Sequence, residues 1–370
     1  MTQLKIAILG TRGIPNNYGG FEYATEKLSV GLVLRGHDVT VYNSHNHSYE
    51  DHSWNGVHLI HCNDPENKFR TAGQFIYDLN CIRDARKRNF DVIIMMGYTS
   101  NAIWGKLYPK KSVIITNMDG LEWKREKYSR TTRTFLKYAE KLAVRHSDFC
   151  ITDSVVIQNY LSEKYKIDPA YIPYGADLLQ QQTTKSSENY SVEKEEYFML
   201  MARMEPENNV ETILEGFHNS NSLKKIIVVG NTKNKFGKYL VNKFKKDERI
   251  KFAGSIFVPQ DVNNLLANAY IYFHGHSVGG TNPSLLQAMA NKVLIAAHSN
   301  AFNRAILQND ALYFSDFRDV QNIIDNVQLG EKEEMMIRNN LEKISCEFNW
   351  KKIIDQYEKF IYECYHKLNP

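Results

Sequence analysis

The sequence lacks several features that mark particular classes of protein. No apolar run approaches the roughly 20 residues that a helix needs to cross a bilayer. The five cysteines are scattered, odd in number and never arranged as C-x-x-C, a pattern typical of reduced thiols in a cytosolic protein. An apolar strand is expected almost at the N-terminus, so we expect no signal peptide. Together these absences predict a cytoplasmic protein.

Strong charge of either sign is also absent. The 46 basic and 42 acidic residues leave a net charge of +4, which is too mild to indicate nucleic acid as a partner. It is compatible with an anionic small ligand or with light contact with an anionic membrane. No two aspartates lie two positions apart, so the chain has no Asp-x-Asp motif that could hold a divalent metal on a diphosphate. The histidine pairs at 45/47 and 274/276 lack further ligands, so we expect no metal site.

Short apolar runs alternate with helical patterns along the chain, and this alternation predicts an α/β fold with parallel sheets. The first run, Leu4–Gly10, is followed by a glycine-rich loop, a helical pattern and a second strand, which together form one βαβ unit. Further strands are expected near residues 90–97, 112–120 and 149–154 in the first half of the chain. In the second half they are expected at 197–203, 224–231, 249–254, 269–275, 293–299 and 311–314. The stretch from Trp123 to His146 has a basic, helical pattern.

The segment YIPYGAD (Tyr171–Asp177) and the polar run at 180–196 interrupt this alternation and predict a domain boundary. We therefore expect two Rossmann-like, doubly wound domains, residues 1–172 and 173–349, facing each other across a cleft. A final helix at about 350–370 has an apolar face, typical of core packing, and is expected to pack back onto the first domain.

The most informative segment is HGHSVGGTNPSLLQAMA (His274–Ala290), in which a strand, a glycine pair and a helix follow one another. Thr281 or Asn282 is a suitable N-cap, and Pro283 suits the first helical position. The free N–H groups of such a helix start attract anions, and glycines let a phosphate approach the backbone. A capped structural helix is the alternative. We predict that Gly279, Gly280, Thr281, Asn282 and Ser284 bind a phosphorylated donor.

Two further segments place charged residues at expected strand ends. Arg203 follows a strand of the second domain, where parallel sheets bind ligands, and a guanidinium can grip a diphosphate. A surface ion pair is the alternative. Asp119 and Glu122 follow a strand of the first domain, where a carboxylate could accept from sugar hydroxyls or stabilise a cationic transition state. Capping of a helix by Asp119 is the alternative there.

The first glycine loop, TRGIPNNYGG, does not match G-x-G-x-x-G, so a dinucleotide site is weakly supported. The helix start at Gly19, Gly20 and Glu22 could still meet a phosphate or a sugar. A tight strand-to-helix turn explains the same residues equally well.

Four segments taken together, GTRGIPNNYGGFE, NMDGLEWKR, ARMEPENN and HGHSVGGTNPSLLQAM, resemble glycosyltransferase family 4. Within that family they are most similar to the bacterial β-1,4-rhamnosyltransferases of capsule and polysaccharide synthesis. The resemblance extends from Leu4 to about Trp350. It implies the GT-B architecture and a metal-independent retaining transfer without a cofactor. It also implies a nucleotide-diphosphate sugar, such as dTDP-L-rhamnose, as donor and a glycan or lipid-linked oligosaccharide as acceptor.

The resemblance also assigns roles to single residues. Arg203 corresponds to the family's phosphate-gripping arginine and, with Asp119, is the expected catalytic pair. The family's usual lysine is replaced by Asn208, and its paired glutamates are replaced by Gly279 and Gln287. Asn208 and Gln287 are expected to contact the donor, as are Gly19 and Gly20, whereas Glu22 and Glu122 are expected to contact the acceptor.

These departures from the family pattern leave a second hypothesis open, a degenerate homologue that only binds a sugar nucleotide or a partner transferase. A sugar-nucleotide epimerase of related fold is a third. The basic stretch from Trp123 to His146 further predicts peripheral contact with the anionic inner face of the cytoplasmic membrane. A solvated helix face is the alternative for that stretch.

Overall fold

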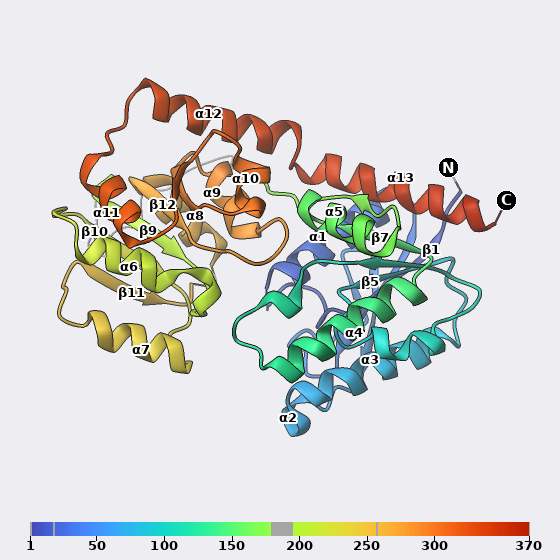
Figure 1. The fold of residues 1–370 in the computed structure, drawn as a ribbon. Helices are drawn as coiled ribbons and strands as arrows, with labels where there is room; N and C mark the ends of the chain where they lie inside the picture. Colours follow the sequence, from blue (N-terminus) through green and yellow to red (C-terminus); the bar gives the residue numbers. More distant parts are fainter. Residues whose placement is uncertain (1, 18, 179–194, 257, 370) are drawn as a thin grey trace. The chain divides into compact units, whose positions relative to one another are not determined.

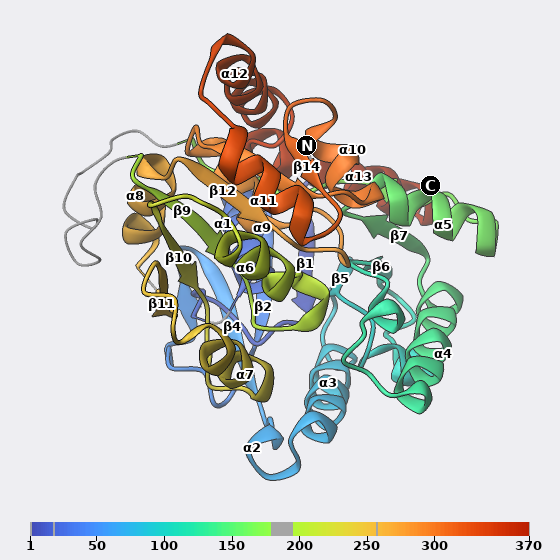
Figure 2. The same ribbon diagram turned by 60° about the vertical axis from the view of Figure 1, so that its left-hand side comes forward.

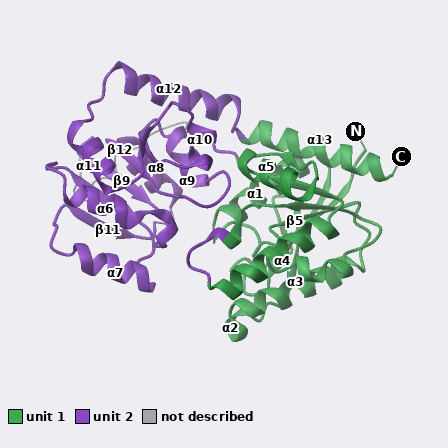
Figure 3. Cartoon of the chain, in the orientation of Figure 1, with its two compact units in different colours: residues 1–123, 129–174, 350–370 green, residues 124–128, 175–349 purple. Residues whose placement is uncertain are grey.

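The computed structural model describes residues 2–17, 19–178, 195–256 and 258–369. The chain divides into two compact α/β units (Figure 3). Unit 1 comprises residues 1–123, 129–174 and 350–370, and unit 2 comprises residues 124–128 and 175–349. The polar run that we interpreted as part of a domain boundary lies, from residue 180 to 194, outside the described residues.

Within the described residues, unit 1 contains an eight-stranded sheet in the order β3-β4-β2-β1-β5-β6-β7-β8. All neighbouring pairs are parallel except β3 with β4. Chain order reverses between β1 and β5, which makes their carboxyl ends the switch point where such sheets bind ligands. The strands are β1 (Lys5–Leu9), β2 (Asp38–Ser44), β3 (Ser53–Trp54), β4 (Val57–Cys62), β5 (Val92–Met96), β6 (Val113–Asn117), β7 (Phe149–Thr152) and β8 (Ala170–Tyr171).

Helices cover this sheet because each buries one apolar stripe. On one face, Ala7 and Leu9 of β1 share a buried cluster with Tyr77 and Cys81 of α3. The C-terminal helix α13 packs against α1 so closely that a side chain at Gly31 would collide with Ile354. The helices and 3₁₀ turns of unit 1 are α1 (Gly20–Leu34), α2 (Glu66–Phe69), α3 (Thr71–Ala85), η1 (Ala102–Leu107), η2 (Glu122–Lys124, whose last residue belongs to unit 2), α4 (Arg130–His146), α5 (Val155–Tyr165) and α13 (Trp350–Leu368).

Unit 2 contains, in its described part, a six-stranded parallel sheet in the order β11-β10-β9-β12-β13-β14. Numbered along the unit, this is the order 3-2-1-4-5-6 of dinucleotide-binding Rossmann folds. Its switch point therefore lies between β9 and β12. The strands are β9 (Tyr197–Met201), β10 (Lys225–Val229), β11 (Ile250–Gly254), β12 (Ile271–His274), β13 (Leu294–His298) and β14 (Leu312–Phe314).

The two faces of this sheet are covered by different helices, as the alternation of side chains along a strand requires. Phe198 and Leu200 of β9 share a core with residues of α6, α7 and α11, whereas the hydroxyl of Tyr197 donates to the Leu265 carbonyl of α8. Helices α6 and α11 lie side by side (Figures 1 and 2). The helical elements are η5 (Pro206–Asn208), α6 (Val210–His218), α7 (Lys235–Phe244), α8 (Pro259–Asn268), α9 (Pro283–Ala290), α10 (Ala301–Leu307), α11 (Phe317–Asn326) and α12 (Glu331–Cys346).

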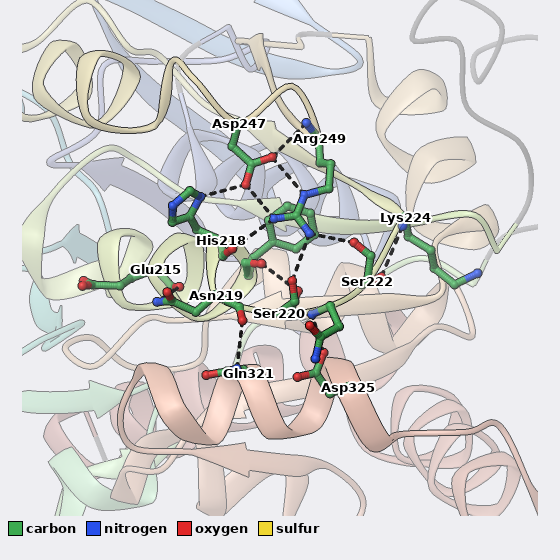
Figure 4. Close-up of polar contacts among 12 residues, drawn as sticks. Glu215, His218, Asn219, Ser220, Ser222, Lys224, Asp247, Arg249, Gln321 and Asp325 are labelled. Carbon is green, nitrogen blue, oxygen red and sulfur yellow. Dashed lines mark hydrogen bonds and ion pairs between the residues drawn. The ribbon is translucent and has the colours of Figure 1, made fainter.

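A polar network at one edge of unit 2 joins the end of α6 to the start of β11 (Figure 4). The Arg249 guanidinium donates to the carbonyls of His218, Ser220 and Ser222 at 3.0, 3.1 and 2.7 Å. It also donates twice to the Asp247 carboxylate, at 2.9 and 2.7 Å. These bonds lower the pKa of Asp247 to about 2. One side chain thus satisfies the carbonyl of the last residue of α6 and two carbonyls of the loop that follows.

The structure confirms every strand expected from the sequence. It adds β3, β4 and β8, which are short or alternate polar and apolar side chains. The expected helix at Trp123–His146 is wrong for its first seven residues. Helix α4 begins only at Arg130, because the hydroxyl of Ser129 caps it by accepting from the Thr132 N–H at 3.2 Å.

Candidate functional site

The loops that leave β9 and β12 are in tight contact at the switch point of unit 2. A side chain at Gly275 would lie only 2.1 Å from the Asn208 carbonyl oxygen, so the backbones can approach this closely only with glycine there. The Asn209 amide donates to the Gly275 carbonyl at 2.8 Å. Residues after the two strands are therefore brought together even though some seventy positions separate them.

The loop after β12 ends in a well-formed helix start. Asn282, not Thr281, is the N-cap of α9, with its Oδ1 accepting from the Ser284 N–H at 3.0 Å and from its hydroxyl at 2.7 Å. Thr281 is buried, and Gly279 has a φ of +134°, which favours glycine. Gly280 lies between them. This geometry matches both the anion-binding interpretation and the structural one.

Arg203 is exposed at the end of β9. Its carbonyl accepts from the Asn208 side-chain amide at 2.8 Å and from the Glu205 N–H at 2.8 Å. Asn208 itself is buried, and its amide nitrogen is committed to this loop. In this position Asn208 shapes the turn that presents Arg203.

Two histidines that the sequence did not mark as binding residues are stacked at the end of β12. The rings of His274 and His276 lie 4.5 Å apart. Burial lowers the pKa of both, and the nearby charges of Arg203 and Arg125 help bring that of His276 to about 3. Both imidazoles are therefore neutral at neutral pH. Among the described residues, Nδ1 of His276 has no hydrogen-bond partner although it is buried.

Gln287 lies on α9, one turn beyond this helix start. Its side-chain amide donates to Asn263 of α8 at 2.8 Å, and the Asn291 amide donates to the same oxygen at 3.1 Å. The side-chain amide of Gln287 therefore helps to hold α9 against α8.

In unit 1 the glycine loop makes a sharp turn against β5. Gly10 has a φ of +88°, and a side chain there would lie 2.4 Å from the Met96 carbonyl oxygen. Gly19 precedes α1, which begins at Gly20. The carboxylate of Glu22 accepts from the Arg12 N–H at 3.2 Å and is buried, so it stabilises the loop from within.

Asp119 and Glu122 follow β6, at the same sheet edge. Gly97 is close to both Asp119 and the first turn of α1. A Cβ atom at Gly97 would lie 3.6 Å from Oδ1 of Asp119 and 4.0 Å from the ring of Phe21. The hydroxyl of Tyr98 holds the turn by donating to the Gly120 carbonyl at 2.7 Å. The start of α1 and the Asp119 carboxylate are thus brought together in unit 1. Asp119 does not directly precede a helix, as a helix cap would, because η2 begins at Glu122.

The predicted site residues therefore form two groups, one at the switch point of each unit. The sequence contains Arg125 in its basic stretch, Glu207 as a possible ion-pair partner of Arg203, and the pair His274/His276, but it did not predict that Arg125 lies near Glu207 and His276. That proximity depends on chain segments that are distant in sequence. Among the described residues, no group of three or more His, Cys, Asp or Glu is placed to hold a metal ion. Nor is any described helix long and apolar enough to cross a membrane.

Two family models match successive parts of the chain. Residues 3–177 match a domain of unknown function (DUF1972), and residues 181–345 match the model described as glycosyl transferases group 1. No curated protein sequence matches the chain.

Solved structures resemble the chain over almost its whole length. The sucrose-phosphate synthase from Thermosynechococcus elongatus has a TM-score of 0.81 at 16% identity, covering 99% of this chain and 100% of its own. The Anabaena protein HepE in complex with UDP and glucose has a TM-score of 0.79 at 16% identity, with coverages of 98% and 100%. A glycosyltransferase from Rickettsia africae ESF-5 has a TM-score of 0.70 at 13% identity, with coverages of 98% and 99%. At such identities the likeness shows the fold alone.

Proposed function

Because the chain belongs to the group 1 glycosyltransferases, family 4, and has the GT-B fold, we propose that it transfers L-rhamnose, with retention, from dTDP-L-rhamnose to a glycan acceptor. Its N-terminal part is a DUF1972 domain. The acceptor in this proposal is a lipid-linked oligosaccharide of cell-surface polysaccharide synthesis. The choice of rhamnose rests on the motifs that resemble β-1,4-rhamnosyltransferases.

The observation that carries the proposal is that Arg203 and the loop leading to α9 follow the two adjacent strands, β9 and β12, that form the switch point of unit 2. Arg203 is an exposed cation, and the glycine loop leads to a helix whose N-terminus carries partial positive charge. Both features suit the diphosphate of a sugar nucleotide. HepE, which has the same fold, was solved with UDP and glucose.

The chemistry follows from charge. When the bond from the sugar to the diphosphate breaks, negative charge grows on the departing phosphate. Arg203 and the backbone N–H groups of the loop near Thr281 and Asn282 would stabilise that charge without a metal ion. The neutral imidazole of His276 could exchange a hydrogen bond with the donor without adding charge.

The carboxylates of unit 1 suit the sugar side of the reaction. Asp119, beside the first turn of α1, would accept hydroxyl hydrogen bonds or stabilise positive charge on the transferred sugar. Glu122 and the helix start at Gly19 and Gly20 would line the same region. Glu22, which accepts from the Arg12 N–H, would support that loop from behind.

A panel of sugar nucleotides tests the proposal. Thermal unfolding would be followed with dTDP-L-rhamnose, UDP-glucose and a guanosine-diphosphate sugar. A selective ligand at 100 times its Kd stabilises the native state by about 2.7 kcal/mol. We expect the largest rise in Tm with dTDP-L-rhamnose. A rise with only the uridine or guanosine donors would overturn the choice of rhamnose.

Turnover separates transfer from binding alone. We expect release of nucleoside diphosphate that depends on a glycan acceptor. Selective donor binding without any release, across lipid-linked acceptors, would favour the degenerate binding protein. Conversion of the donor without an acceptor would favour an epimerase.

A further inference from the structure

Two arginines lie near His276, and only one of them comes from the loop after β9. The other, Arg125, belongs to the segment Lys124–Tyr128, which groups with unit 2 although the residues on either side of it group with unit 1 (Figure 3). After burial, the charges of Arg203 and Arg125 are the largest influences that lower the pKa of His276. Both guanidinium groups therefore act on the same imidazole.

Glu207 is a buried acidic residue beside Arg125. Its side chain is 1% exposed, and its Oε1 lies 3.7 Å from Nη1 of Arg125. Within the described residues neither carboxylate oxygen accepts a hydrogen bond. A buried carboxylate needs a compensating charge, and the guanidinium of Arg125 supplies one.

Glu207 is in turn tied to the loop that carries the glycine pair. Its carbonyl accepts from the Ser277 N–H at 3.1 Å and from the Ser277 hydroxyl at 2.7 Å. The position of Arg125 is therefore linked to the loop that leads into α9. The next pair along the segment differs, because Lys127 and Glu205 are 3.8 Å apart and about a quarter exposed.

The surroundings of His276 favour an anionic ligand. The charges of two guanidinium groups act on its neutral, buried ring, whose Nδ1 has no hydrogen-bond partner among the described residues. A diphosphate would be attracted by both arginines and would give Nδ1 of His276 a partner. At 3.7 Å the contact of Arg125 with Glu207 is a charge contact and not a bidentate pair.

We propose that Arg125 is a second diphosphate-binding residue of the donor site, presented by the segment Lys124–Tyr128 and held in place by Glu207. This inference rests on the proposed function and names a residue that the resemblance to the family does not. Arg125 would be a second cation in the donor site of unit 2. The neutral side chain of Asn208 cannot take that role, because its amide donates to the Arg203 carbonyl.

The experiment must distinguish two roles of Arg125, which are binding of the ligand and neutralisation of the buried charge of Glu207. Arg125→Ala alone would leave a buried carboxylate without a partner and could unfold the protein. The informative comparison is therefore the double variant Arg125→Ala/Glu207→Gln against Glu207→Gln alone, with Lys127→Ala as the control from the same segment. Calorimetry would measure the Kd for dTDP, dTMP, UDP and inorganic pyrophosphate, with a melting curve for each variant.

We expect the double variant to bind the nucleoside diphosphate at least about tenfold more weakly than Glu207→Gln, as is typical for loss of a charge-assisted contact. The affinity for pyrophosphate should fall in parallel, and the preference for dTDP over dTMP should shrink. Lys127→Ala should stay within about twofold of the parent protein.

Equal affinity of the double variant and Glu207→Gln would overturn the inference, because Arg125 would then only compensate Glu207. That result leaves the proposed function intact if the parent still binds dTDP and Arg203→Ala still weakens it. A parent protein that binds neither dTDP nor UDP would overturn both.

Discussion

At the scale of single residues, exposure distinguishes Arg203 from the polar side chains around it. Asn208 and Thr281 are buried, and Asn282 caps α9. Arg203 is exposed, and its backbone is held by Asn208 and Glu205. A rigid backbone that presents a long cation suits a residue whose partner is a ligand.

Substitution of Arg203 should therefore affect catalysis and not folding. We expect Arg203→Ala to lower kcat on the order of 10²–10³-fold, because a fixed donor to the departing group helps the transition state most. Arg203→Lys should recover little, because an ammonium lacks the guanidinium fork. Steady-state turnover and a melting curve for each variant make the measurement.

Arg338→Ala, at an exposed position on α12, is the matched control and should leave turnover unchanged. If Arg203→Ala is folded and stays within about threefold of the parent, the diphosphate is held elsewhere. The glycine loop at Gly279–Gly280 would then be the primary site.

At the scale of elements, the network around Arg249 shows how one side chain fixes the end of a helix and the start of a strand. We expect Arg249→Ala to destabilise the protein by roughly 1–3 kcal/mol, because several carbonyls lose their donor. Urea unfolding at pH 7 would measure this.

The same network predicts a pH dependence. The pKa of Asp247 is lowered from 3.8 to about 2, so the carboxylate stabilises the fold fully above pH 4. That contribution is lost as the pH falls from about 4 towards 2. The difference in urea midpoint between the parent and Asp247→Asn should be largest at neutral pH and shrink below pH 4. A difference for Asp247→Asn that does not change with pH would contradict the assignment.

Helix α4 is a second element whose extent matters. The sequence suggested one basic helix from Trp123, but the cap at Ser129 separates two different groups of cations. Arg125 and Lys127 form ion pairs in unit 2. Arg130, Lys137, Lys141 and Arg145 are exposed on α4.

At the scale of the whole molecule, the mild positive charge and the exposed face of α4 predict binding to anionic membranes. Tyr138, 56% exposed, adds an aromatic side chain among these cations. Each cation near an anionic surface contributes about 1 kcal/mol, screened by salt. We expect more protein to sediment with anionic than with neutral vesicles at low salt.

Charge reversal provides the control for this prediction. Lys141→Glu/Arg145→Glu on α4 should lower the partition coefficient by more than about tenfold. Lys332→Glu/Arg338→Glu on α12 changes the net charge equally and should have a smaller effect. Equal binding of the parent to both kinds of vesicle would show that α4 is only a solvated face.

The sequence by itself determined the α/β class, the main strands of both sheets and a helix start capped by Thr281 or Asn282, because these depend on local periodicity and on capping within a few residues. It also marked Arg203 and Asp119 as residues that follow buried strands. Their roles as catalytic residues remain proposals. The small parallel edge strand β8 and the cap at Ser129 escaped it, since two-residue strands carry no periodicity and a basic run continues across the cap.

Only the tertiary structure decided which distant residues meet. The side-chain amide of Asn209 donates to the Gly275 carbonyl, that of Gln287 donates to Asn263, and Arg125 approaches Glu207 across some eighty positions. Such contacts depend on the order of the strands in the sheet and on the close backbone approach at Gly275. Neither can be inferred from a short stretch of sequence, because both exist only once the parallel sheet has assembled.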